Sequence, residues 1–104
     1  MKRLYWRAIG KSGRIETIND ISTAIYSCGY ISEFKRFSDI SLSIIIEITG
    51  KNIPTLTEKI SKLSGLDHGN INSISEDEQY IILLHLSFPE AAGNLEIEVP
   101  AVPG

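Results

Sequence analysis

Hydrophobic residues recur along this chain with two periods, every second residue in some segments and every third or fourth residue in others. The period of two is clearest over residues 40–48. The apolar side chains on one predicted face of that segment are Ile40, Leu42, Ile44, Ile46 and Ile48. Because successive side chains of a strand point to opposite sides, this alternation predicts a strand with one covered face. The ranges 2–9, 30–37 and 79–88 are predicted as three further strands, and the pattern in 30–37 is the weakest of them.

The helical period predicts two helices. The apolar stripe of the first consists of Ile15, Ile18, Ile21, Ile25 and Cys28. Ser12 is expected to cap the start of this helix, and Gly29 to end it in the left-handed conformation. Residues 52–64 predict the second helix, whose stripe is Leu56, Ile60 and Leu63 and whose first turn contains Pro54.

The resulting order is β-α-β-β-α-β, which is the ferredoxin-like arrangement of the α+β class. It predicts a four-stranded antiparallel sheet with both helices on one face, in a single domain spanning residues 1–88. Residues 66–78 are expected to be a polar connection that could include a short strand. In the remaining extension, residues 89–104, Leu95, Ile97 and Val99 alternate with glutamates and predict an additional strand over 95–99. The alternative for that extension is a frayed terminus.

The composition indicates which partners and which cellular compartment to expect. The chain has 104 residues, of which 42% are hydrophobic, and a net charge of −3. Nucleic acid and membrane surfaces attract proteins with a basic face, and this net charge does not indicate one. We therefore expect neither nucleic acid nor a membrane as a partner. Cys28 is the single cysteine, which rules out a disulfide within the chain and fits a reducing compartment. The apolar runs are too short to span a bilayer, and we expect a cytoplasmic protein.

The face of the sheet opposite the helices is also predicted to carry apolar side chains. These are Tyr5, Ile45, Ile81 and Leu83. Monomeric proteins usually avoid a contiguous exposed patch of this kind. We therefore expect a homodimer that associates through the sheet face or its edges, with 95–99 as a further candidate contact.

The segment from Ile9 to Ile18 resembles the first strand-to-helix turn of ACT domains, and Leu63 to Leu66 is similar to the helix exit of that family. The resemblance covers roughly residues 3–88. It implies a regulatory module that binds an amino acid or a similar small molecule, often at a subunit interface. One departure is that the Asp-x-Pro usual before the glycine of this turn is absent, and Lys11 and Ser12 stand there instead.

The same turn is the best candidate ligand site. Its residues are Gly10, Lys11, Ser12, Gly13, Arg14 and Ile15. Glycine permits positive φ and close backbone approach, and a helix N-terminus offers amide groups to an anion. With two cations nearby, a carboxylate or phosphate is the expected ligand. The alternative is that the glycines only make the turn and Ser12 only caps the helix.

No other group of residues predicts chemistry. His68 is expected in a solvated loop. His85 is expected on the open sheet face, where we expect it to form a hydrogen bond at an interface rather than to act in catalysis. Cys28 is interpreted as a small buried hydrophobe. The acidic cluster 76–78 lacks the spaced carboxylates of a calcium loop. No catalytic set, metal site or cofactor is expected, although Arg14 leaves acylphosphatase-like chemistry open.

These observations predict a regulatory or small-molecule-binding module without catalytic activity, acting in trans as a homodimer. The alternative is a structural interaction protein that docks a partner through the open sheet face or the 95–99 strand.

Overall fold

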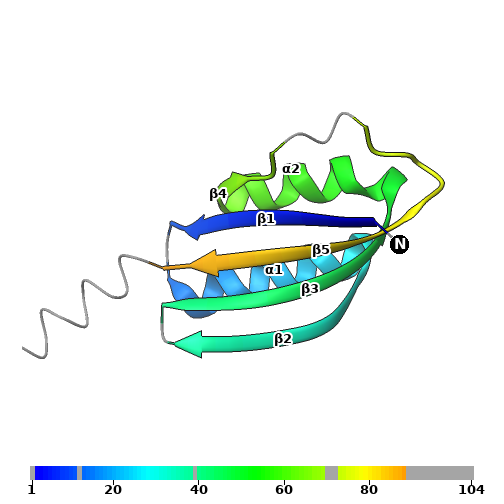
Figure 1. Ribbon diagram of the computed structural model, residues 1–104. Helices are drawn as coiled ribbons and strands as arrows, with labels where there is room; N and C mark the ends of the chain where they lie inside the picture. Colours follow the sequence, from blue (N-terminus) through cyan, green and yellow to red (C-terminus); the bar gives the residue numbers. More distant parts are fainter. Residues whose placement is uncertain (1, 12, 39, 70–72, 89–104) are drawn as a thin grey trace, which may run out of the picture.

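The computed structural model describes residues 2–11, 13–38, 40–69 and 73–88. The extension 89–104, with the strand predicted at 95–99, lies outside the described residues. The elements, in chain order, are β1 (Lys2–Gly10), α1 (Arg14–Cys28), β2 (Tyr30–Ser38), β3 (Ser41–Thr49), the 3-10 turn η1 (Gly50–Asn52), α2 (Ile53–Leu63), β4 (Ser64–Asp67) and β5 (Gln79–Ser87). Figure 1 shows the sheet from its open side, with α1 behind it.

Within the described residues, the sheet has five strands in the order β2-β3-β5-β1-β4. β5 lies between β1 and β3, parallel to β1 and antiparallel to β3, while β2 and β4 form the two edges. The predicted α+β class with two helices is confirmed, but the predicted four-stranded antiparallel sheet is wrong. A short strand directly after α2 occupies the edge beside β1, and the last described strand enters the centre.

The central position of β5 follows from its composition. Residues 80–84 are apolar without interruption, which is typical of a strand with neighbours on both sides and cover on both faces. Tyr80, Ile82, Leu84 and Leu86 are buried on the helical side. Ile81 and Leu83, on the other side, are half-buried. An edge position would have left this run exposed to water.

The core lies between the sheet and the two helices. The strands contribute the even-numbered residues of β1, β3 and β5, and the helices contribute one stripe each. The helical residues that are buried in it are Thr17, Ile21, Ala24, Ile25, Ile53, Leu56 and Ile60. The stripe predicted for α1 was wrong at its start, because Ile15 is 68% exposed and Thr17 points inward.

The predicted helix caps were partly wrong. Gly13 is the N-cap of α1 and makes no side-chain hydrogen bond there, and Ser12 lies outside the described residues. Gly29 ends α1 with a φ of −159°, which is extended and not left-handed. A Cβ at Gly29 would lie 2.7 Å from the carbonyl oxygen of Glu47, so this glycine allows the chain to pass close to β3. Pro54 lies in the first turn of α2, as predicted.

Hydrogen bonds connect the segment before β5 to the residues that follow β3. The amide of Gly50 donates to the carbonyl of Glu78 (2.8 Å), and the amide of Lys51 donates to that of Glu76 (3.1 Å). The hydroxyl of Tyr80 accepts from the amide of Ser75 (2.8 Å). These bonds fix the point at which β5 enters the sheet beside β3.

We expect Gly50→Ala to lower the free energy of unfolding by about 1–3 kcal/mol, because the new Cβ would collide with the backbone carbonyl of Ser75. Gly65→Ala is the matched control, since a Cβ there meets no atom closer than 3.9 Å. Its effect should stay within about 0.5 kcal/mol. Urea denaturation of both variants measures the difference, and equal stabilities would contradict the close packing at Gly50.

Candidate interaction surface on the open sheet face

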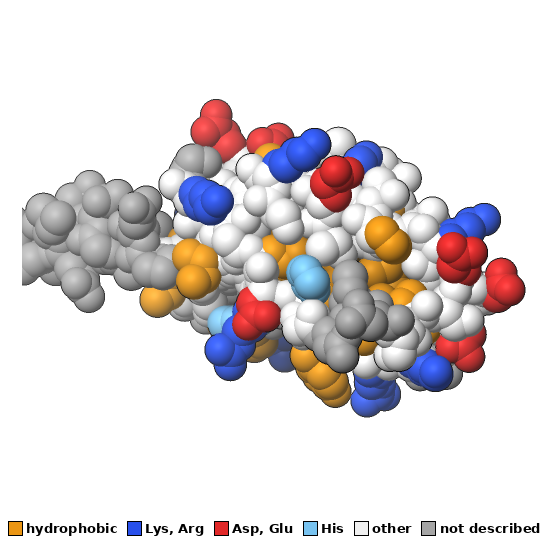
Figure 2. Space-filling view, turned by 90° about the horizontal axis from the view of Figure 1, so that it is seen from above, with side chains coloured by type: hydrophobic (Ala, Val, Ile, Leu, Met, Phe, Trp, Pro, Cys, Tyr) orange, Lys and Arg blue, Asp and Glu red, His pale blue; other side chains and the backbone are white. Residues whose placement is uncertain are grey.

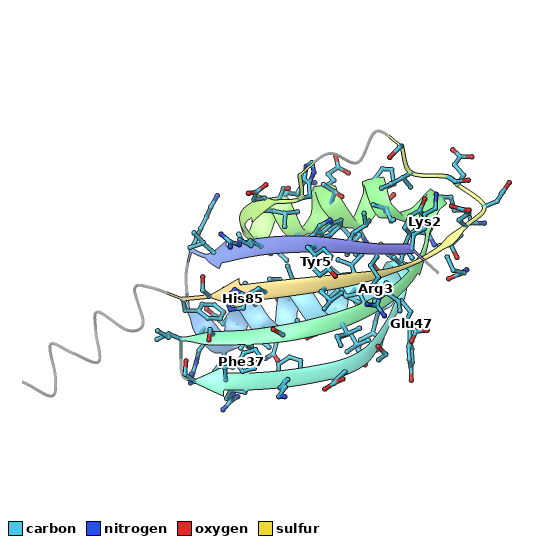
Figure 3. All side chains as sticks on the ribbon, viewed as in Figure 1. Lys2, Arg3, Tyr5, Phe37, Glu47 and His85 are labelled. Carbon is cyan, nitrogen blue, oxygen red and sulfur yellow. The ribbon has the colours of Figure 1, made fainter. Side chains whose placement is uncertain are left out.

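The side of the sheet opposite the helices is uncovered in the described chain. Alternation places Arg3, Tyr5, Arg7 and Ile9 of β1 on this side, and all four are exposed, Tyr5 by 70%. Figure 3 shows Arg3, Tyr5, Phe37, Glu47 and His85 on this side of the sheet. The strand register then sets which residues of neighbouring strands lie side by side across the face.

The middle of the face is apolar. Tyr5 pairs in register with Leu83, and Leu83 pairs with Ile45. We call these three residues the apolar row. Leu83 and Ile45 are half-buried although no helix covers them, because their neighbours shield them in part. Side chains paired across strands are within reach of one another, so the row forms one continuous apolar strip.

One end of the face carries opposite charges. Arg3 pairs in register with Ile81, and Ile81 pairs with Glu47, which gives the charged row. Two strand spacings, about 10 Å, separate the backbones of Arg3 and Glu47. In the part of the chain that the structure describes, neither side chain forms an ion pair. Both charges are therefore available to a group placed above the sheet.

The other end carries a polar row that crosses all five strands. Its members, from β4 to β2, are Asp67, Arg7, His85, Ser43 and Lys35. The prediction that His85 lies on the open face is confirmed, and its side chain is exposed. At the β2 edge, Lys35 Nζ lies 5.7 Å from the ring centroid of Phe37, which is itself exposed.

The turn predicted to bind a ligand has a different local role at Gly10. A Cβ at Gly10 would collide with the ring of Phe88, so the glycine makes room for that ring. Neither Gly10 nor Gly13 has a positive φ, so the turn does not use the left-handed conformation that glycine permits. The Gly13 carbonyl accepts the amide of Thr17 at 3.0 Å and so opens α1. Lys11 is exposed beside this turn.

The other residues that the sequence singled out contact neighbouring parts of the fold. His68 is half-buried and not fully solvated, with its ring centroid 6.3 Å from that of Trp6. Cys28 is half-buried against the core, and its carbonyl accepts from Asn52 Nδ2 at 3.0 Å. In the acidic cluster, Glu78 pairs with Lys2 at 3.3 Å. Among the described residues no three acidic, histidine or cysteine side chains are grouped as metal ligands.

Sequence reasoning missed the charged row and the unpaired indole N–H of Trp6. The alternation of β1 placed Arg3 on the open face, but its neighbours depend on β5 being the adjacent strand. Trp6 is 1% exposed, and its indole Nε1 has no hydrogen-bond partner among the described residues. Its even position in β1 was the signal for burial, although nothing in the sequence indicated the unpaired N–H.

Comparison with protein-family models, with curated proteins and with solved structures gave no significant match. Within the described ranges, no helix has the length and apolar character that a membrane span requires. The surface itself therefore carries the functional argument.

We expect Trp6→Phe to cost much less stability than its loss of volume suggests, because the substitution removes a buried N–H that lacks a partner. Trp6→Ala should cost about 3–5 kcal/mol, and Trp6→Phe less than about 2 kcal/mol. Tyr80→Phe is the control, since it deletes a hydroxyl that is hydrogen-bonded. Denaturation followed by circular dichroism compares the three, and equal losses for the two Trp6 variants would contradict the explanation.

Proposed function

We propose that this protein is a non-catalytic interaction module that binds a protein partner through the open sheet face. One observation carries the proposal: the apolar row of Tyr5, Leu83 and Ile45 crosses the middle of a face that no other described element covers. Single exposed apolar residues are ordinary on a monomer, but a continuous strip rimmed by polar groups is typical of a docking surface.

The composition of the face supports this proposal. Tyrosine and arginine, which are enriched in the centres of protein interfaces, occupy β1 as Tyr5, Arg3 and Arg7. In the view onto α2 and β4, acidic and basic side chains are scattered among hydrophobic ones (Figure 2). A scattered mixture of this kind keeps a surface soluble, whereas an apolar strip gains free energy when it is covered.

A second proposal is that the turn Gly10–Ile15 binds a small amino-acid-like ligand and that the module is regulatory, as its resemblance to ACT domains implies. The observation in its favour is that α1 begins at Gly13, which adds no side chain over the first turn, beside the exposed Lys11. Amide groups at the first turn of a helix attract a carboxylate, and a cation adds to that attraction. The open face is the first proposal because more residues support it.

Photo-crosslinking tests the docking surface even when the identity of the partner is unknown. We expect benzoylphenylalanine in place of Tyr5 to give a defined protein adduct in cells that express the chain. The same replacement of Tyr26, on α1, should give none. The two positions are matched, because both are tyrosines with exposures of 70% and 59%, and they lie in different layers. If Tyr5 gives no adduct, or both positions give the same ones, the docking proposal is wrong.

Titration tests the ligand proposal. We expect a branched-chain or other amino acid to shift the amide resonances of Gly13, Arg14 and Ile15, while those of β2 stay unchanged. A ligand that binds the folded form also raises its melting temperature. If no amino acid of the panel shifts any of the three amide resonances, the proposal is wrong.

A further inference from the structure

We propose that the partner is a second copy of this chain, stacked face to face with a two-fold axis running along β5. This inference rests on the proposed docking function of the open face and specifies its partner. The geometry depends only on the strand order, the register and the charges of the described residues.

The strand order makes the open face suitable for self-association. β5 is the middle strand, with β3 and β1 on either side and β2 and β4 beyond them. A two-fold axis parallel to β5 leaves each row in place and exchanges β1 with β3 of the other copy. It also exchanges β4 with β2. Each row therefore meets the same row of the second copy, read in the opposite direction.

In the charged row, this exchange joins opposite charges. Arg3, on β1, comes to lie over Glu47 of the second copy, on β3, because the two residues share one register row. The symmetry repeats the pair on the other side of the axis. Ile81 lies on the axis between the two pairs and meets Ile81 of the second copy. Neither charge has an ion-pair partner within the described chain, so the pairing displaces no existing ion pair.

In the apolar row, the same exchange joins apolar groups. Tyr5 comes to lie over Ile45 of the second copy, and Leu83 meets its own counterpart on the axis. The centre of the contact is therefore dry and apolar. Burial of Tyr5 supplies most of the gain in free energy, because it is the most exposed of the large hydrophobic side chains of the face.

In the polar row, the outer strands are complementary as well. Lys35, on β2, faces Asp67 of the second copy, on β4, at the rim of the contact. Arg7 faces Ser43 of the second copy, and His85 meets its counterpart on the axis. Rim pairs of this kind add little affinity but help to select one orientation.

The charges also exclude the other in-plane axis. A two-fold axis perpendicular to the strands would reverse the order of the rows and place Arg3 over Arg7 of the second copy. Glu47 would then face Ser43 and lose its partner. Like charges in contact across an interface cost free energy, so the axis along β5 is favoured. Twisted sheets stack with an angle of about −30° between strands, which a small tilt of this axis accommodates.

The face is large enough for a stable contact. Four of the five strands are nine residues long, and β4 at one edge has four residues. With strands about 4.8 Å apart, the face measures at most roughly 20 by 30 Å. Two copies would together bury on the order of 1,000 Å² or more, which is the lower range of specific interfaces.

Charge exchange between two variants tests the geometry. We expect the wild-type chain to sediment as a dimer, and Arg3→Glu and Glu47→Arg each to raise the dimer Kd at least tenfold, because each variant opposes like charges twice. Mixed in equal amounts, the two variants should form a heterodimer with near wild-type Kd, since both pairs then join opposite charges. The matched controls Lys62→Glu and Glu58→Arg change the same charges on exposed positions of α2 and should leave the Kd unchanged.

Recovery on mixing also shows that both variants are folded. The proposed dimer is overturned if the wild-type chain is a monomer at about 100 μM, or if the single variants keep the wild-type Kd. It is also overturned if the two variants, each with native circular dichroism, do not recover dimerisation when mixed. The docking proposal has a separate readout: an adduct between position 5 and a different protein would refute the second copy as partner and leave the docking surface standing. Absence of any adduct would refute both.

Discussion

The structure depends on the insertion of β5 between β1 and β3. Without this strand, β1 and β3 have no shared neighbour, because each pairs otherwise only with an edge strand. β5 also supplies the middle of the core through Ile82 and Leu84, both fully buried. It is the last described strand to be synthesised, so the sheet can close only after both helical crossovers exist. Non-local pairing of this kind is slow to form, and the bonds of Gly50 and Lys51 to the segment before β5 reduce the freedom of its entry.

The same insertion determines the open face. Because β5 is the middle strand of five, the face is approximately symmetric about it, with one inner and one outer strand on each side. Ile81 and Leu83 occupy the middle, and charged groups occupy the inner strands as Arg3 and Glu47. With β1 directly beside β3, Arg3 and Glu47 would be adjacent and could neutralise each other within one chain. The apolar strand between them keeps the two charges apart.

The local elements could be predicted from the sequence because each depends on residues close in the chain. The alternation over 40–48 and the stripe around Ile21 and Ile25 were sufficient to predict a strand and a helix, and both are observed, as β3 and α1. The strand order could not be predicted, because β4 is four residues long and has no alternation of its own. The uninterrupted apolar run at 80–84 is typical of a central strand, but it does not determine which strands lie beside it. The rows of the open face are properties of that neighbourhood and were not predictable.

The two proposed sites lie at different places on β1 and need not compete. The charged row is near the start of β1, whereas the turn Gly10–Ile15 follows its end, about 23 Å further along the strand. The end of β1 is held rigidly, because the ring of Phe88 packs against Gly10 and the amide of Phe88 donates to the carbonyl of Ile40 at 2.7 Å. A ligand at the turn would therefore act on the stacked face only through the backbone of β1. Tyr5 and Arg3 belong to that strand, so β1 is the element that the two proposed sites share.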